Sequence, residues 1–201
     1  MKTFNKTLIA ATTIATFGLA AAPAALSLEA SAGLSTSYLF RGAEERDGTA
    51  VVYADVSSST AGVSYGLFIS SGDTETEHDY YVSYAGSASD ISYEIGYVDY
   101  NYQNQSDDPA PDSTDFRESY VSLGYGPVSV TRYNGIGNDD EYTVVGYEAG
   151  AFSVAYGENN AAGMPESHMD VSYAVNDSLS ITVSDPDDGD TVFAASYSLP
   201  F

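Results

Sequence analysis

The sequence predicts an all-β fold, a closed antiparallel transmembrane β-barrel of twelve strands, with short periplasmic turns and longer acidic extracellular loops. Apolar residues recur at every second position in successive segments of the chain, which is typical of strands with one apolar face. Short and long connections alternate strictly between these segments, as they do in bacterial membrane barrels. A soluble periplasmic β-sandwich is the alternative fold, but nothing in a sandwich requires this alternation.

Composition narrows the class of protein further. The 201 residues include 18 Tyr and no Cys, so the fold depends on packing and backbone pairing and has no disulfides. The net charge is −23, which excludes nucleic acid as a partner. After export only Arg41, Arg46, Arg117 and Arg132 remain against 29 acids, a net charge of about −25. A salt-adapted acidic proteome is an alternative cause of this charge.

Residues 1–24 are predicted to be a cleaved signal peptide, and residues 25–201 the mature barrel in a Gram-negative outer membrane. Two lysines precede an apolar run that is followed by small residues. A cut after Ala24 keeps the first strand whole, whereas the alternative cut after Ala32 removes its start. A membrane-anchoring helix is a further alternative, but the apolar run is shorter than the ~20 residues of a span.

The first strand is expected to run from Leu28 to Phe40, because apolar and polar residues alternate throughout this segment. The short turns are expected at Ser58–Gly62, Ala85–Asp90, Gly124–Pro127, Glu148–Ala151 and Val175–Ser178. The long loops are expected at Gly42–Thr49, Gly72–His78, Gln103–Asp115, Asn134–Glu141, Gly157–Ser167 and Ser184–Asp190. Eleven connections make twelve strands, and an even number leaves both termini on the periplasmic side.

The last strand carries the most specific pattern in the chain. One face of it holds large apolar residues at almost every second position, namely Phe193, Ala195, Tyr197, Leu199 and Phe201. This pattern resembles the C-terminal motif that the barrel-assembly machinery recognises, so that machinery is an expected partner. The alternative is an ordinary edge strand that happens to end on Phe.

The first third of the mature chain resembles a known family. Leu34-Ser35-Thr36-Ser37-Tyr38-Leu39-Phe40-Arg41-Gly42 is followed by an acidic loop, a strand, and Ala61-Gly62-Val63-Ser64-Tyr65-Gly66-Leu67-Phe68. Between Glu29 and Asp73 this arrangement is similar to the TorF family of proteobacterial porins; beyond Tyr100 the similarity is only topological. The resemblance implies an outer-membrane barrel with a channel role. The loop Ala43-Glu44-Glu45-Arg46-Asp47 departs from the Ser/Gln-containing loop of the family.

With Val and Leu placed outward, the inward-pointing charges are expected to be Glu29, Arg41, Asp55, Glu94, Glu118, Glu148 and Asp170. Rings of carboxylates attract cations in a narrow pore, so this set predicts a cation-preferring lumen. The alternative is that the acids pair with Arg41, Tyr hydroxyls and water in a closed barrel. Arg41 itself is expected either to form a constriction or loop anchor, or to bridge the first two strands.

The long loops are rich in Asp, as in Asp107-Asp108, Asp139-Asp140-Glu141 and the segment Asp185–Asp190. Alternate carboxylates with a Gly resemble calcium loops, but no bidentate Glu follows at the required distance. We therefore expect solvated loops without a specific metal site, able to bind divalent cations loosely next to lipopolysaccharide.

Catalysis and cofactors are not expected. The histidines are His78 and His168, and the adjacent Ser167 faces the other side of a strand from His168, so they cannot form a dyad. A pair between His78 and a Ser on the next strand stays open. The sequence thus favours a porin for small hydrophilic solutes or cations; a closed barrel with a structural or surface-interaction role is the alternative.

Overall fold

The computed structural model describes residues 27–71, 75–104 and 116–201. The predicted signal peptide and Asp107-Asp108 lie outside these residues. Within the described residues, no helix is long and apolar enough to cross a membrane.

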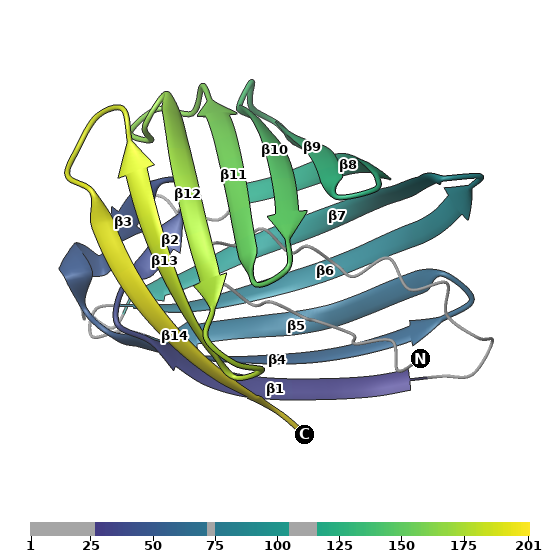
Figure 1. The fold of residues 1–201 in the computed structure, drawn as a ribbon, viewed down its shortest axis with the longest axis horizontal. Coiled ribbons are helices and arrows are strands. Elements are labelled where there is room, and N and C mark those ends of the chain that lie inside the picture. Colours follow the sequence, from purple (N-terminus) through teal and green to yellow (C-terminus); the bar gives the residue numbers. More distant parts are fainter. Residues whose placement is uncertain (1–26, 72–74, 105–115) are drawn as a thin grey trace.

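Twelve antiparallel strands form a closed barrel (Figure 1). They are β1 (Ser27–Ser35), β4 (Val51–Thr60), β5 (Val63–Ser71), β6 (Glu75–Ala88), β7 (Ile91–Asn104), β8 (Phe116–Tyr125), β9 (Val128–Gly135), β10 (Glu141–Ala149), β11 (Phe152–Asn159), β12 (Ser167–Ala174), β13 (Leu179–Pro186) and β14 (Val192–Pro200). The barrel closes where β1 pairs with β14, for example Leu34 opposite Tyr197. The predicted twelve-stranded barrel is therefore confirmed, and closure excludes the sandwich.

Sequence neighbours pair all the way round, so each connection joins adjacent strands. Four of the connections on one rim are two-residue turns, and Ala61-Gly62 shows why the chain can turn there. Both residues have positive φ (49° and 84°), as a type I′ hairpin turn requires. We call this end the short-turn rim and the opposite end the long-loop rim. β1 begins and β14 ends at the short-turn rim, where Figure 1 marks the C-terminus.

Alternate residues of each strand face two different environments. On β12, Met169 and Val171 are exposed on the outer surface, whereas Asp170 and Ser172 are buried inside the barrel. The same division holds around the wall, with most Leu, Val and Ile and many Tyr outside, and Ser, Thr, Gly, carboxylates, other Tyr and a few small apolar residues inside. An apolar outer band needs hydrocarbon around it, and a closed sheet pairs its backbone groups without water. The fold is that of a membrane-spanning barrel.

The first strand differs from its prediction. β1 ends at Ser35, and residues 36–50 turn into the barrel instead of continuing the wall to Phe40. We call residues 36–50 the luminal insert. It forms a small hairpin of β2 (Tyr38–Phe40) and β3 (Ala43–Glu45), then a 3-10 turn η1 (Arg46–Gly48), before β4 resumes the wall.

The insert supplies much of the core of the molecule. Leu39 is fully buried, and Phe40 joins a cluster of luminal side chains contributed by β7 to β11, namely Val98, Tyr100, Tyr120, Tyr133, Tyr142, Val144 and Ala155. Phe40 meets Tyr100 edge to face, with 6.1 Å between ring centroids. Tyr38 and Phe40 therefore face luminal side chains, although the alternation in the sequence predicts them on the lipid side. Burial of these rings stabilises the insert within the barrel.

Candidate functional site

The tip of the insert is a two-residue turn formed by Arg41 and Gly42. Their φ values are 50° and 86°, so both residues lie in the left-handed region. Gly adopts this conformation freely, but Arg does so only at a cost of about 1–2 kcal/mol. Gly42 also packs against His168 of β12, so closely that a Cβ at position 42 would clash with the imidazole side chain. The turn therefore places Arg41 in the lumen despite an unfavourable backbone conformation.

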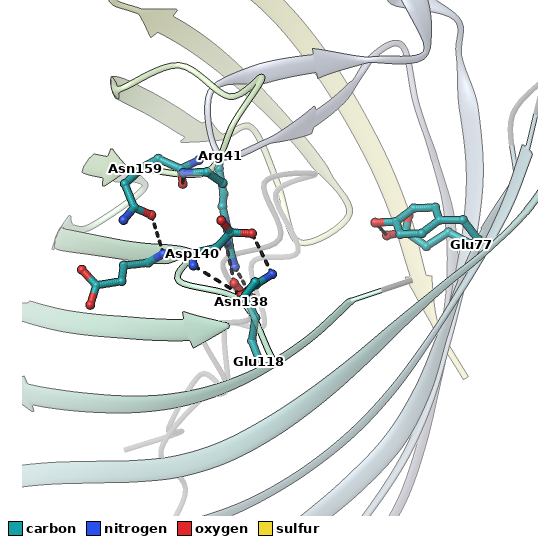
Figure 2. Close-up of polar contacts among 10 residues, drawn as sticks. Arg41, Glu77, Glu118, Asn138, Asp140 and Asn159 are labelled. Carbon is teal, nitrogen blue, oxygen red and sulfur yellow. Dashed lines mark hydrogen bonds and ion pairs between the residues drawn. The ribbon is translucent and has the colours of Figure 1, made fainter. Parts of the chain in front are cut away.

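Arg41 reaches across the lumen to β8. Its two terminal nitrogens donate to the two carboxylate oxygens of Glu118, with Nη1 2.9 Å from Oε1, and both side chains are buried (Figure 2). Three aromatic rings surround the guanidinium, with its Cζ 4.8 Å from the ring centroid of Phe40, 4.9 Å from Tyr133 and 4.4 Å from Tyr142. A paired carboxylate and aromatic faces both favour a planar cation. Arg41 was expected either to form a constriction or loop anchor, or to bridge the first two wall strands. The structure contradicts the second role, because Arg41 pairs with Glu118 of β8.

A second arginine anchors the other part of the insert. Arg46 has φ 66°, and its Nη2 lies 2.9 Å from Ser70 Oγ and 3.5 Å from Glu77 Oε2. Its guanidinium stacks over Tyr38, 4.7 Å from the ring centroid. In Figure 2, Glu77 lies apart from the Arg41–Glu118 pair. The insert is thus held at two places on the lumen wall.

Glu77 of β6 accepts several hydrogen bonds at this second anchor. Tyr38 and Ser70 donate to Oε2, the latter over 2.9 Å, and Tyr102 donates to Oε1 over 2.8 Å. Tyr38 belongs to the insert and not to a spanning strand. Burial, and then the carboxylates of Glu77 and Asp79, raise the pKa of its phenol well above the ordinary value, so Tyr38 remains a proton donor.

A chain of buried polar groups extends from the Arg41 site along β12. The hydroxyl of Tyr142 is 2.9 Å from His168 Nε2, and His168 Nδ1 is 3.2 Å from Asp170 Oδ1. Ser184 donates to the same carboxylate oxygen over 2.6 Å. The group next to Nε2 is a phenol and not the serine that a Ser–His hydrolase needs. His78 lies on the outer face of β6, where its backbone carbonyl accepts a hydrogen bond from Asn101.

The seven predicted luminal charges occupy different depths. Arg41, Glu94, Glu118 and Asp170 are buried in the lumen, and Glu94 accepts a 2.6 Å hydrogen bond from Tyr120. Asp55 is half-buried and accepts from Tyr81 over 2.9 Å. Glu29 and Glu148 are exposed at the short-turn rim.

The predicted inventory of one cation and six acids is wrong in two respects. Arg46 is a second buried cation, because the loop that was expected to lie outside folds inward. Glu77 and Asp79 are additional buried acids on β6. This strand begins at Glu75 and so includes Glu77, although the long loop was expected to extend to His78. Two acids spaced by one residue directly before the alternating Tyr81 and Ser83 were the sequence feature that could have placed them on the inward face.

The last strand presents its large residues outward. Phe193, Tyr197 and Leu199 are exposed on the outer face of β14, and Phe201 follows the strand with 83% of its surface exposed. The amide of Phe201 donates to the carbonyl of Ala30, which holds the chain end against β1. Ala195, on the same face, is half-buried.

The acidic loops gather no metal cluster in the part of the chain that the structure describes: no three His, Asp or Glu side chains there are close enough to hold an ion. Their carboxylates make local contacts instead. Asp140 accepts from Asn138 over 2.8 Å, as Figure 2 shows, and Asp187 accepts from the amide of Ser167 over 3.1 Å.

Comparison with known proteins finds similarity of structure only. No protein-family model and no curated protein sequence matches the chain. Outer membrane phospholipase A from Escherichia coli is similar over 85% of this chain and 88% of its own, with 11% identity and a TM-score of 0.46. The Salmonella typhi outer membrane phospholipase dimer with bound calcium gives 12% identity, 85% and 89% coverage and a TM-score of 0.45. A mutant porin from Rh. blastica is 11% identical, with coverage of 88% of this chain and 100% of its own and a TM-score of 0.34.

Proposed function

We propose that this chain is a narrow diffusion channel of a Gram-negative outer membrane, with a preference for cations and small hydrophilic solutes. The observation that carries the proposal is the charge of the lumen. Among the described residues, buried luminal carboxylates belong to Glu77, Asp79, Glu94, Glu118 and Asp170, whereas the buried cations are Arg41 and Arg46. Carboxylates in excess of cations attract mobile cations and repel anions.

The luminal insert sets the width of this channel. It contacts β6 through Glu77, β8 through Glu118 and β12 through His168, so it crosses the interior near the long-loop rim. Solutes have to pass between the insert and the remaining wall. A twelve-stranded barrel narrowed in this way suits ions and small solutes and not large ones.

Purified protein in planar bilayers tests the proposal. Under a KCl gradient we expect a reversal potential of the sign given by K⁺ permeation, and liposome swelling with small neutral solutes. Anion preference would contradict the cation part of the proposal. Absence of any conductance would contradict the channel itself.

A closed barrel with a structural or surface-interaction role is the second candidate. The burial of Leu39, Phe40 and Arg41 in the lumen favours it, because a densely packed insert leaves less open cross-section. Protein without conductance, both with its insert and with the insert shortened, would favour this candidate over the channel.

Export and assembly belong to the same proposal. A cleaved signal peptide, recognition of β14 by the barrel-assembly machinery, and contact of the acidic loops with lipopolysaccharide are all consistent with a barrel of this kind. The resemblance of residues 29–73 to the TorF porins also fits the proposal and stays a prediction. We propose no enzymatic activity: His168 contacts a phenol and a carboxylate, and Ser184 reaches Asp170 instead of the imidazole.

A further inference from the structure

The wall of the barrel contains a complete binding site for a guanidinium group. Glu118, Tyr133 and Tyr142 lie on the adjacent strands β8, β9 and β10, and Tyr133 is the direct cross-strand partner of Tyr142. The carboxylate accepts hydrogen bonds from both terminal nitrogens of the guanidinium, and the two rings lie within 4.9 Å of its central carbon. All three residues are buried luminal side chains that do not belong to the insert.

Arg41 occupies this site as a tethered group. Its backbone lies at φ 50°, a position where two-residue hairpin turns favour Asn, Asp or Gly. Strain of this kind persists only where surrounding contacts compensate for it. The contacts that compensate here are those of the side chain with Glu118 and the rings, so the binding energy of the guanidinium holds the insert tip in place.

We propose that Glu118, Tyr133 and Tyr142 form a guanidinium-binding subsite on the channel wall, that Arg41 fills it as an internal ligand, and that solutes carrying a guanidinium group compete with Arg41 for it. That such solutes then pass through the barrel rests on the proposed function. Their binding to the subsite does not depend on passage.

The chemistry of the subsite selects among cations. A guanidinium donates two parallel hydrogen bonds to one carboxylate and stacks on aromatic faces, whereas an ammonium is a compact, strongly hydrated charge. A tether of this length gives Arg41 an effective concentration on the order of millimolar, so a free competitor needs at least millimolar concentrations in the native protein. Removal of the Arg41 side chain lifts that competition.

The test uses the full-length barrel in detergent with methylguanidinium as the probe. Arg41→Gly removes the side chain and suits the positive φ; Arg41→Lys leaves a weaker occupant in case the Gly variant does not form a barrel. Isothermal calorimetry and the thermal unfolding temperature are measured for each. Methylurea controls for planar shape without charge. Methylammonium controls for charge without the planar pair of N–H donors. Arg132→Ala is the control variant, because it removes an arginine that pairs with Glu141 on the exposed surface and not in the lumen.

We expect methylguanidinium to bind Arg41→Gly at least about tenfold more tightly than the native protein and to raise its unfolding temperature, because the effective concentration of the tether no longer opposes it. The affinity of Arg41→Lys for methylguanidinium should lie between those of the native protein and Arg41→Gly. Methylurea should have no effect. Adding Glu118→Gln to Arg41→Gly should abolish binding. Equal binding to native, Arg41→Gly and Arg41→Gly/Glu118→Gln proteins, or none to either Arg41 variant, would overturn the inference. Conductance is measured separately, so a non-conducting barrel that binds the probe contradicts the channel and not the subsite.

Discussion

At the scale of single residues, luminal glycines make room for tyrosine rings on neighbouring strands. Gly96 of β7 lies beside Tyr120 of β8, its direct cross-strand partner, and a Cβ at position 96 would clash with the ring. The ring lies beside the glycine and directs its hydroxyl to Glu94. An aromatic ring over a strand glycine covers backbone that the missing side chain leaves open.

Gly96→Ala should therefore destabilise the barrel by about 1–3 kcal/mol, because Tyr120 has to leave its position and its hydrogen bond with Glu94. Equilibrium unfolding in urea measures the change. Gly146→Ala is the matched control, since the group nearest its added Cβ is the hydroxyl of Ser129, which can rotate away. We expect the control to change the free energy of unfolding by less than about 1 kcal/mol. Equal destabilisation by both changes would contradict the role of Tyr120.

The Arg41–Glu118 pair offers a second measurement at this scale. Both side chains are buried, so removal of one leaves an uncompensated charge. Glu118→Gln should destabilise the protein by about 3–5 kcal/mol. Arg41→Gly should cost less, because Gly also relieves the strain of about 1–2 kcal/mol at this positive φ. The double variant should be more stable than the sum of the single changes predicts, by about 1–3 kcal/mol in a double-mutant cycle. Additive single changes would show that the two groups do not interact energetically.

At the scale of elements, strict alternation in the sequence was enough to predict the twelve strands and most of their ends. The turn predicted at Gly124–Pro127 is observed between Tyr125 and Val128, because period two and turn residues are both local properties. The insert could not be predicted in the same way. Tyr38 and Phe40 continue the alternation of β1, and only burial by distant strands distinguishes a luminal hairpin from a wall strand.

The site shows the same division between local and distant information. The alternation of apolar and polar residues predicts that Glu94, Glu118 and Asp170 face the lumen, but it does not predict their hydrogen-bond partners. The pairing of Arg41 with Glu118 joins residues 77 positions apart, and it depends on where the insert crosses the lumen. Arg46 was missed for the same reason, whereas the alternation before Tyr81 could have shown that Glu77 faces inward.

Replacement of residues 36–50 by Asn-Gly tests the insert as an element. Ser35 and Val51 are cross-strand partners, so a two-residue turn can join β1 directly to β4. Among the described residues, Thr36 bonds to Ala195 at the end of the strand ladder, and the other hydrogen bonds between the insert and the wall involve side chains. The backbone pairing of the wall strands therefore does not depend on the insert, and the shortened chain should still form a barrel, seen as different migration of unboiled and boiled protein in gel electrophoresis. We expect its single-channel conductance to rise. Unchanged conductance in a correctly formed barrel would show that the insert does not set the width of the path.

The end of β14 gives a second prediction for an element. Phe201 is exposed beyond the strand, and its side chain contributes little to the packing of the folded barrel. If the assembly machinery recognises it, Phe201→Ala should lower the amount of assembled barrel in cells but leave the unfolding of purified, refolded protein almost unchanged. Val175→Ala, at an exposed position near the same rim, is the control. Loss of stability in vitro would indicate a structural role instead.

At the scale of the whole molecule, negative charge occupies two separate regions. Exposed carboxylates lie in the long loops, where salt screens them, and buried carboxylates line the lumen, where screening is weaker. A general adaptation to salt explains the first region without reference to transport. The second region requires another cause, because Asp79, Glu94 and Asp170 are buried and their ionised forms are costly to bury.

The triple variant Asp79→Asn, Glu94→Gln and Asp170→Asn tests how much the luminal region alone contributes to ion selectivity. Each amide keeps the shape of the acid, so the barrel should persist while three acidic groups are removed from the lumen. We expect the ratio of cation to anion permeability, measured from reversal potentials in a KCl gradient, to fall toward one. The difference from native protein should be largest at about 0.1 M salt, where the Debye length is about 10 Å, and should fade near 1 M, where it is about 3 Å.

A matched triple variant on the long-loop rim makes the test specific. Glu158→Gln, Glu166→Gln and Asp187→Asn remove the same number of acidic groups from exposed positions around the β11–β12 loop. These exposed groups are hydrated and screened, so their removal should alter selectivity much less than removal of the luminal three, even though the formal net charge changes equally. Equal effects of the two triple variants would mean that overall charge controls selectivity. A larger effect of the luminal triple variant would locate the selectivity in the lumen, close to the insert that narrows it.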